Sequence, residues 1–243
     1  MLYRKDLAYI HHSGFSEFAE SAAPGLLEIL WRRGIRAGRI VEVGCGSGIL
    51  ARELTRAGFD VLGYDASPAM IALARETAPR AQFEVASFDS VEIPGCAAVI
   101  AMGEVLNYGT FDAVRAFVAR ATKARMLIFD VAERGAYPPY DERRVEGDDW
   151  SVITIKESDG TTLTRRILTF RAEGDAMRRD EEVHRLQLYD RAELTSLLRA
   201  HGFRVRRRRS YGTRRLPEGH AVYVAERSTQ ARRQPALPAR GAG

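Results

Sequence analysis

The sequence predicts an α/β fold, in which helices cover both faces of a sheet and a small antiparallel β insertion follows the fifth strand. Over residues 35–132 and again over 190–227, short β-branched runs alternate with segments of helical spacing. The run 97–102 is almost wholly apolar, as expected for a strand covered on both faces. Between these two parts, residues 133–189 contain β-rich runs separated by turn pairs.

The first segment, residues 1–34, is predicted to be a helical cap. Residues 1–14 show no clear periodicity, whereas Phe15, Phe18 and Ala22 follow one helical face. A second helix is expected after Pro24, because proline interrupts a helix interior.

The central motif comes next. Ile40, Val41 and Val43 indicate a buried strand, and glycines at positions 44, 46 and 48 then make a turn that side chains would obstruct. Helical spacing resumes at Ile49. A strand, a glycine turn and a helix N-terminus let a ligand lie against bare backbone. A second strand over 60–64 ends at Asp65, a position where an acid can accept hydrogen bonds from both hydroxyls of a ribose.

Residues 42–48 together with 63–67 resemble the class I S-adenosylmethionine-dependent methyltransferases. Their Gly-x-Gly-x-Gly spacing is one residue tighter than that of dinucleotide enzymes. An acid inside the strand, Glu42, suits a ligand that carries an ammonium and a sulfonium. The resemblance implies a Rossmann-like seven-stranded sheet in the order 3-2-1-4-5-7-6, with the seventh strand antiparallel.

The resemblance also implies the residues that bind the donor. These are Glu42, Gly44, Cys45, Gly46, Gly48, Asp65, Ala66, Met70, Ser87, Phe88, Met102 and Gly103. Many relatives place an acid at the end of the third strand to bind the adenine amino group, whereas this chain has Ser87 there. Two other interpretations of the glycine turn are a turn that only packs a helix on the sheet and a nicotinamide-binding site.

The remaining elements follow the same alternation. Strands are expected over 83–85, 126–131, 203–210 and 220–225, and the helix caps are Ser67, Thr110 and Asp190. Within 133–189 we expect three antiparallel strands, with turns at 159–160 and 174–175, because Asp-Gly between β-rich runs predicts a hairpin. Tyr137-Pro-Pro-Tyr140 is interpreted as a linker. Residues 228–243 are expected to be disordered.

Length and composition limit the class of protein. The chain has 243 residues, 45% of them hydrophobic and 28% charged, which suits one soluble α/β domain with an insertion. No apolar run approaches the roughly 18 residues of a membrane span. Two cysteines give neither a disulfide framework nor the spacing of a metal site, so the expected location is the cytoplasm. The oligomeric state is left as monomer or homodimer.

The charge balance bears on nucleic acid as a partner. The net charge is +5, and much of the excess lies near the end of the chain, over 204–215 and 232–240. Aromatic residues are sparse there, so no platform for stacking bases is evident. An edge strand protected by charge and a solvated tail explain the two clusters, and nucleic acid is not the expected partner.

The implied chemistry is in-line displacement at a methyl group, which needs a general base only where the attacking atom arrives protonated. His184 on the third insertion strand is the first candidate base, with a surface histidine as the alternative; His11 and then His12 follow. His220 is interpreted as structural. Tyr9, Asn107 and Tyr108 are expected to contact the acceptor.

The leading hypothesis is methyl transfer to an oxygen or nitrogen of a small molecule. The strand-rich insertion resembles that of sugar and other natural-product methyltransferases, in which it covers the substrate. The alternatives are a methyltransferase acting on RNA or protein, a nicotinamide-dependent oxidoreductase, and a protein that binds the donor without catalysis.

Overall fold

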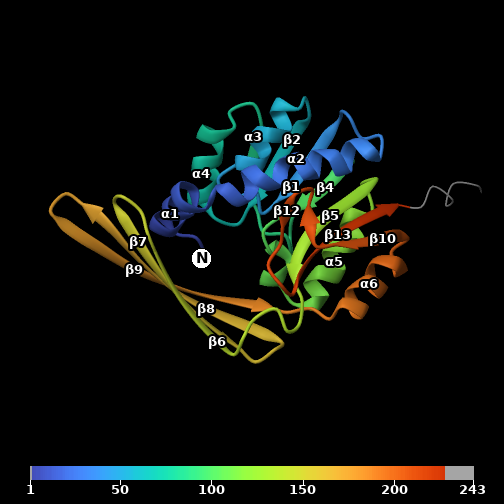
Figure 1. Cartoon of the computed structure of the whole chain (residues 1–243). Coiled ribbons are helices and arrows are strands. Elements are labelled where there is room, and N and C mark those ends of the chain that lie inside the picture. The colour runs from blue at the N-terminus through green and yellow to red at the C-terminus, as the bar shows by residue number, and fades with distance from the viewer. Residues whose placement is uncertain (1, 228–243) are drawn as a thin grey trace, which may run out of the picture.

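The computed structural model describes residues 2–227 and is built around a central sheet (Figure 1). This sheet is parallel except for one strand. Within these residues seven strands lie in the order β10-β13-β5-β4-β1-β2-β3, and β13 runs antiparallel to both of its neighbours. The predicted order is confirmed. The strands are β1 (Arg39–Val43), β2 (Asp60–Asp65), β3 (Gln82–Val85), β4 (Ala98–Ala101), β5 (Met126–Ala132), β10 (Phe203–Arg208) and β13 (His220–Arg227).

Helices pack on both faces of this sheet. Buried residues of α2 (Glu17–Arg32), α3 (Ile49–Arg56) and α4 (Pro68–Thr77) share one hydrophobic cluster with one set of strand side chains. Residues of α5 (Phe111–Ala121) and α6 (Arg191–Ala200) share a second cluster with the alternate set. All of β4 and β5 is therefore buried, as their apolar sequences predict.

The predicted helix caps are confirmed. Ser67 Oγ accepts the Met70 amide at the start of α4, and Thr110 Oγ1 accepts the Ala113 amide at the start of α5. The Asp190 carboxylate accepts two amides at the start of α6. Each cap satisfies backbone donors that the first helical turn leaves free.

The N-terminal helices differ from the prediction. α1 spans Lys5–Phe15, although residues 1–14 show no clear helical periodicity, and α2 continues through Pro24 without a break. α1 has few apolar residues, and they pack on the insertion: Leu7 and Ile10 share a small hydrophobic cluster with Trp150. In α2, burial on both sides of Pro24 outweighs the backbone hydrogen bond that the proline removes.

The insertion contains four antiparallel strands, so the prediction of three was wrong. They lie in the order β6-β7-β8-β9 and are β6 (Tyr140–Glu146), β7 (Trp150–Ser158), β8 (Thr162–Glu173) and β9 (Ala176–Gln187). β6 is a largely exposed edge strand, so its sequence lacks the alternation of a half-buried one. Figure 1 shows this twisted sheet extending away from the body, with α1 between the two.

Smaller elements complete the fold. A short 3₁₀ helix, η1 (Val105–Tyr108), follows β4, and β11 (Ser210–Tyr211) pairs with β12 (Arg214–Arg215) in a hairpin that was not predicted. None of the helices over residues 2–227 is both long enough and apolar enough to cross a membrane. The tail that is predicted to be disordered, residues 228–243, lies outside the described residues.

Candidate active site

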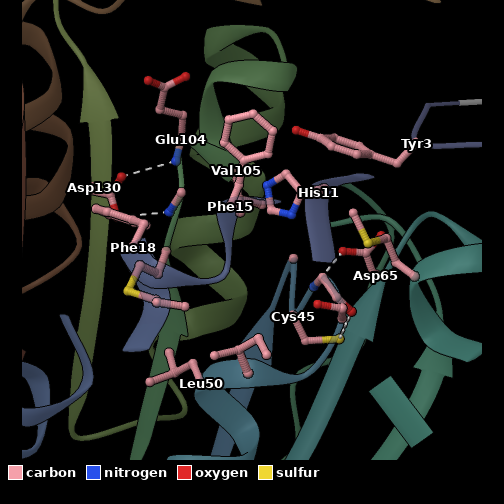
Figure 2. A pocket seen from close by; sticks show the side chains of 18 of the residues that line it. Tyr3, His11, Phe15, Phe18, Cys45, Leu50, Asp65, Glu104, Val105 and Asp130 are labelled. Atoms are coloured by element: carbon pink, nitrogen blue, oxygen red, sulfur yellow. Dashed lines mark hydrogen bonds between the residues drawn. The ribbon is translucent and has the colours of Figure 1, made fainter. Parts of the chain in front are cut away.

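A cavity of about 1030 Å³ opens where β1, β2, β4 and β5 end. Its lining joins two parts of the chain. The turns after the strands supply Gly44, Asp65 and Gly103, whereas the N-terminal segment and the insertion supply residues such as Tyr3 and Arg165. Figure 2 shows Tyr3 and His11 facing the glycine turn and Asp65 across this space. The cavity therefore has one wall of strand ends and another of covering elements.

The three glycines of the turn have positive φ angles of 70°, 52° and 79°, yet they serve different purposes. A Cβ on Gly44 would lie 2.3 Å from the Val105 side chain, whereas a Cβ on Gly46 would meet nothing within 4 Å. Gly48 does not line the cavity; a Cβ there would lie 2.9 Å from the Ala74 backbone. The absence of a side chain at Gly48 thus serves the packing of α3 on α4, and its contact with the donor stays a prediction.

Asp65 fastens the glycine turn to the end of β2. Its two carboxylate oxygens accept the amides of Gly46 and Ser67 at 2.9 and 2.8 Å. Figure 2 shows Asp65 beside the glycine turn. Burial raises the pKa of Asp65 above its ordinary value, while these two amides oppose the rise. Each oxygen keeps a second lone pair, so the carboxylate can still accept hydrogen bonds from two hydroxyl groups.

Glu42 is a buried acid with an unused acceptor. Its side chain lines the cavity, and among residues 2–227 no hydrogen-bond donor reaches Oε2. Burial, followed by the charge of Asp65, raises the pKa of Glu42 well above its ordinary value. A buried acceptor of this kind is costly unless a donor pairs with it. The position fits a ligand that brings a cationic or N–H group.

The other predicted donor contacts lie along the same wall. Cys45, Ala66, Met70, Ser87, Phe88, Met102 and Gly103 all line the cavity. Phe88 is held edge-to-face against Phe117, with ring centroids 5.9 Å apart. Burial raises the pKa of the Cys45 thiol well above its ordinary value, so this thiol stays protonated.

On the opposite side, Glu104 is the centre of a buried charge cluster that the sequence analysis did not predict. Its carboxylate lies 2.6 Å from Arg165 Nη2, 2.6 Å from His220 Nε2 and 2.8 Å from the Tyr137 hydroxyl. Burial favours the neutral acid, but the charge of Arg165 and the hydrogen bond from His220 outweigh it and hold the pKa of Glu104 below its ordinary value. Glu104 has a φ of 61°, which a side chain adopts only at a cost.

Asp130 holds the backbone of this loop. Its carboxylate accepts the amides of Gly103 and Glu104 at 2.9 and 3.1 Å (Figure 2). It also accepts the Tyr211 hydroxyl at 2.7 Å. An acid in an otherwise apolar strand was a signal that could have marked this residue. Glu104 and Arg165 carried no comparable signal.

The predicted bases occupy different places. His184 is fully buried, which excludes the surface alternative, and it does not line the cavity. His11 lines the cavity between Tyr3 and Phe15, where burial, followed by the charge of His12, lowers its pKa to about 4. His12 does not line it, whereas His220, interpreted as structural, does.

Two of the three predicted acceptor contacts lie away from the cavity. The Tyr9 hydroxyl bonds the Asp149 carboxylate, and the Tyr9 ring lies 3.6 Å from the Arg171 guanidinium, outside the cavity. Asn107 is fully buried and bonds backbone groups of Ala132 and Gln187, which is a structural arrangement. Tyr108 lines the cavity, and so does Tyr3, which was not among the predicted contacts.

Residues 40–125, which include the glycine turn and Asp65, match the family described as a methyltransferase domain. Residues 40–125 therefore form a methyltransferase domain, in agreement with the predicted resemblance to the class I S-adenosylmethionine-dependent enzymes. Over 105 residues it is 28% identical to the magnesium-protoporphyrin O-methyltransferase of Rhodobacter capsulatus, and the match covers 41% of this chain and 47% of that protein. The chain thus spans about half the length of that relative.

Solved structures share the fold of this methyltransferase domain and of the elements around it. An S-adenosylmethionine-dependent methyltransferase from Clostridium acetobutylicum matches with a TM-score of 0.78 at 13% identity, over 91% of this chain and 97% of that one. An amino pentose methyltransferase from Micromonospora echinaspora, involved in calicheamicin biosynthesis, matches with a TM-score of 0.71 at 21% identity, over 91% and 95%. At these identities the likeness is one of fold.

Proposed function

We propose that this chain transfers a methyl group from S-adenosylmethionine to an oxygen or nitrogen of a small molecule. The observation that carries the proposal is the unpaired, buried Oε2 of Glu42, which lies in one cavity with the bare backbone of Gly46 and the carboxylate of Asp65. Two acids at this place would repel a nucleotide phosphate, whereas they can accept hydrogen bonds from an ammonium and from two ribose hydroxyls.

The residues present fit this donor. All four of the following residues line the cavity, and we assign Asp65 to the ribose hydroxyls, Glu42 to the ammonium, and Ser87 and Phe88 to the adenine. When bound, the donor supplies a methyl carbon that its sulfonium has already activated. The protein has to position the acceptor about 3–3.5 Å from this carbon and exclude water.

The acceptor half of the cavity is the part under the insertion. Arg143 and Val145 of β6 and Arg165 of β8 line it, so we assign to residues 133–189 the role of a lid over the acceptor. Proteins of similar fold are named as an amino pentose methyltransferase and a sugar N-methyltransferase, which supports a small acceptor. The curated relatives are named O-methyltransferases, so both acceptor atoms are retained.

Ligand binding tests the donor half. Thermal unfolding is followed with S-adenosylhomocysteine, S-adenosylmethionine and NAD in parallel. A ligand at 100 times its dissociation constant stabilises by about 2.7 kcal/mol, on the order of 5–10 °C for this length. Stabilisation by both sulfur ligands is expected. Stabilisation by NAD alone would overturn the proposal.

Turnover tests the acceptor half. Formation of S-adenosylhomocysteine is measured with a panel of phenols, alcohols and amines, and separately with bulk RNA and with protein. Methylation of a panel member is expected, at a rate that added RNA does not lower. Methylation of RNA or protein alone, with salt-sensitive binding, would favour a macromolecular acceptor instead.

A further inference from the structure

A line of hydrogen-bonding groups runs from the buried side of β9 into the cavity. Glu182 Oε2 lies 3.0 Å from His184 Nε2, and His184 Nδ1 lies 3.1 Å from the Tyr108 hydroxyl. The Tyr3 hydroxyl lies a further 3.4 Å on. Tyr3 and Tyr108 line the cavity, whereas His184 is fully buried behind them. The line therefore connects a carboxylate, an imidazole and a phenol that faces the acceptor space.

The carboxylate fixes the tautomer of the histidine. Burial favours neutral Glu182, but hydrogen bonds from His184 and from the Arg4 amide outweigh it and lower the pKa of Glu182 below its ordinary value. An ionised carboxylate only accepts hydrogen bonds, so His184 must carry its proton on Nε2. In the neutral ring Nδ1 is then bare, and the Tyr108 hydroxyl donates to it.

The groups around this line favour a neutral Tyr108 phenol that passes a proton on, and they disfavour a Tyr108 phenolate. Burial raises the pKa of Tyr108 well above its ordinary value, so the phenol stays protonated. Arg165, which pairs with His184 in the β8–β9 register, opposes this rise but does not reverse it. Tyr3 from the N-terminal segment and Glu104 from the loop after β4 also raise the pKa of Tyr108.

The two histidines that line the cavity are poorer bases. His220 Nδ1 lies 3.0 Å from the Glu218 carbonyl and Nε2 lies 2.6 Å from the Glu104 carboxylate, so both ring nitrogens donate and neither is free to accept a proton. The Glu104 hydrogen bond outweighs burial and raises the pKa of His220, in agreement with this assignment. His11, with its pKa lowered to about 4, holds a proton weakly.

We propose that Tyr108, His184 and Glu182 form a proton-accepting relay that selects an acceptor with a hydroxyl group; this inference rests on the proposed methyl transfer. The acceptor oxygen forms a bond to the methyl carbon while the carbon–sulfur bond breaks. The electron pair of the carbon–sulfur bond goes to sulfur. The acceptor proton passes to the Tyr108 oxygen while the Tyr108 proton passes to His184 Nδ1. Tyr108 is the catalytic residue, and His184 and Glu182 are positioning residues.

Kinetic variants test the relay with phenol and alcohol acceptors. Tyr108→Phe removes the phenol oxygen, and His184→Asn keeps an oxygen near Nδ1 that accepts a hydrogen bond but not a proton. Each is expected to lower kcat by about 10²–10⁴-fold and to leave the KM for the donor unchanged. The loss should shrink as the pH rises through the pKa of the acceptor hydroxyl, because an ionised acceptor needs no base.

Tyr189→Phe is the matched control. Its hydroxyl is also buried beside η1, where it donates to the carbonyls of Leu106 and Gly109, but Tyr189 does not line the cavity. It should lose stability and keep most of kcat. Equal losses of kcat in Tyr108→Phe and Tyr189→Phe, at every pH, would show a structural role and overturn the relay.

Nitrogen NMR of the ring of His184 gives a readout without turnover. The wild type should show the tautomer protonated on Nε2. Glu182→Gln can donate to the ring, which should move the proton to Nδ1 and reverse the hydrogen bond with Tyr108. A wild-type ring protonated on Nδ1 would overturn the relay.

The acceptor panel separates the two levels of the inference. Methylation of hydroxyls that depends on Tyr108 supports the relay. Methylation of amines alone, or donor binding with no hydroxyl methylated, overturns the relay and leaves the donor site standing. Failure to bind S-adenosylhomocysteine overturns the proposed function itself.

Discussion

The donor half and the acceptor half of the cavity are built in opposite ways. In the donor half, acids keep free hydrogen-bonding capacity: among residues 2–227, no donor reaches Glu42 Oε2, and the Asp65 carboxylate bonds backbone amides. In the acceptor half, charged side chains pair with one another, as Glu104 does with Arg165 and His220, although no acceptor in the described residues reaches Arg165 Nε. The donor half thus leaves acceptors for its ligand, whereas the acceptor half is held by charge pairs within the protein.

This difference has consequences for stability and binding. Unpaired buried acids cost folding free energy that a matching ligand returns on binding. A closed cluster is held in one geometry before any ligand arrives, which reduces reorganisation during reaction. Variants in the donor half should therefore change affinity, and variants in the acceptor half should change stability and kcat.

The largest effect is expected at the buried ion pair of the acceptor half. Arg165→Met leaves the largely buried Glu104 with His220 but without its guanidinium, and should lower the free energy of unfolding by about 3 kcal/mol in a denaturant titration. Arg166→Met is the control, because its partner Glu181 and Arg166 itself are partly exposed and such pairs contribute about 0–1 kcal/mol. Equal losses in the two variants would break the comparison.

A smaller effect is expected for Asp65→Asn in the donor half. The amide cannot offer a charged acceptor to two hydroxyls, so the dissociation constant of S-adenosylhomocysteine should rise about 100-fold, measured by calorimetry. Asp60→Asn changes an exposed acid at the start of the same strand and should leave the constant within twofold. Unchanged affinity in Asp65→Asn would remove this residue from the donor site.

Glu42→Gln should weaken donor binding about tenfold while stabilising the unliganded protein. Because the pKa of Glu42 is raised in the folded state, the native protein keeps a proton that the unfolded chain has already lost. The wild type therefore loses stability as the pH rises from the ordinary value of 4.5, and the glutamine variant lacks this loss. The Tm difference between them should grow with pH; parallel curves would contradict the prediction.

The smallest effects compare two glycines of one turn. Gly46→Ala and Gly48→Ala both force a side chain into positive φ, at about 1–2 kcal/mol. Gly46→Ala should also lower donor affinity severalfold, because its Cβ enters open cavity. Gly48→Ala should lose more stability and keep its donor affinity, because its Cβ meets the Ala74 backbone. Calorimetry and thermal unfolding together check both outcomes.

The same comparison explains which parts of the site could be predicted from the sequence. The donor half lies in contiguous motifs: Gly46 and Asp65 are only 19 residues apart and end neighbouring strands. The motif spacing, together with the family resemblance that it supports, therefore indicated most of it. Gly48 was grouped with the donor contacts because a glycine required by packing and one required by a ligand look alike in sequence.

The acceptor half depends on contacts between distant residues. Glu104 meets Arg165 from 61 residues away and His220 from 116 residues away. No local pattern encodes such pairs, because Arg165 lies on the four-stranded sheet and His220 on β13, two strands away from β4 in the central sheet. The same holds for Tyr9 and Asn107: their types suit a site, but their partners outside the cavity were not visible in the sequence.

The contacts of Tyr3 bear on the order in which parts of the chain fold. Strands of the four-stranded sheet pair through short turns, so its hairpins close small loops and can form early. Tyr3 bonds Ser67, 64 residues away, and the Glu182 carboxylate, 179 residues away. These contacts exist only after α4 and β9 are in place. We therefore expect the N-terminal segment to dock last during refolding, after the walls of the cavity have formed.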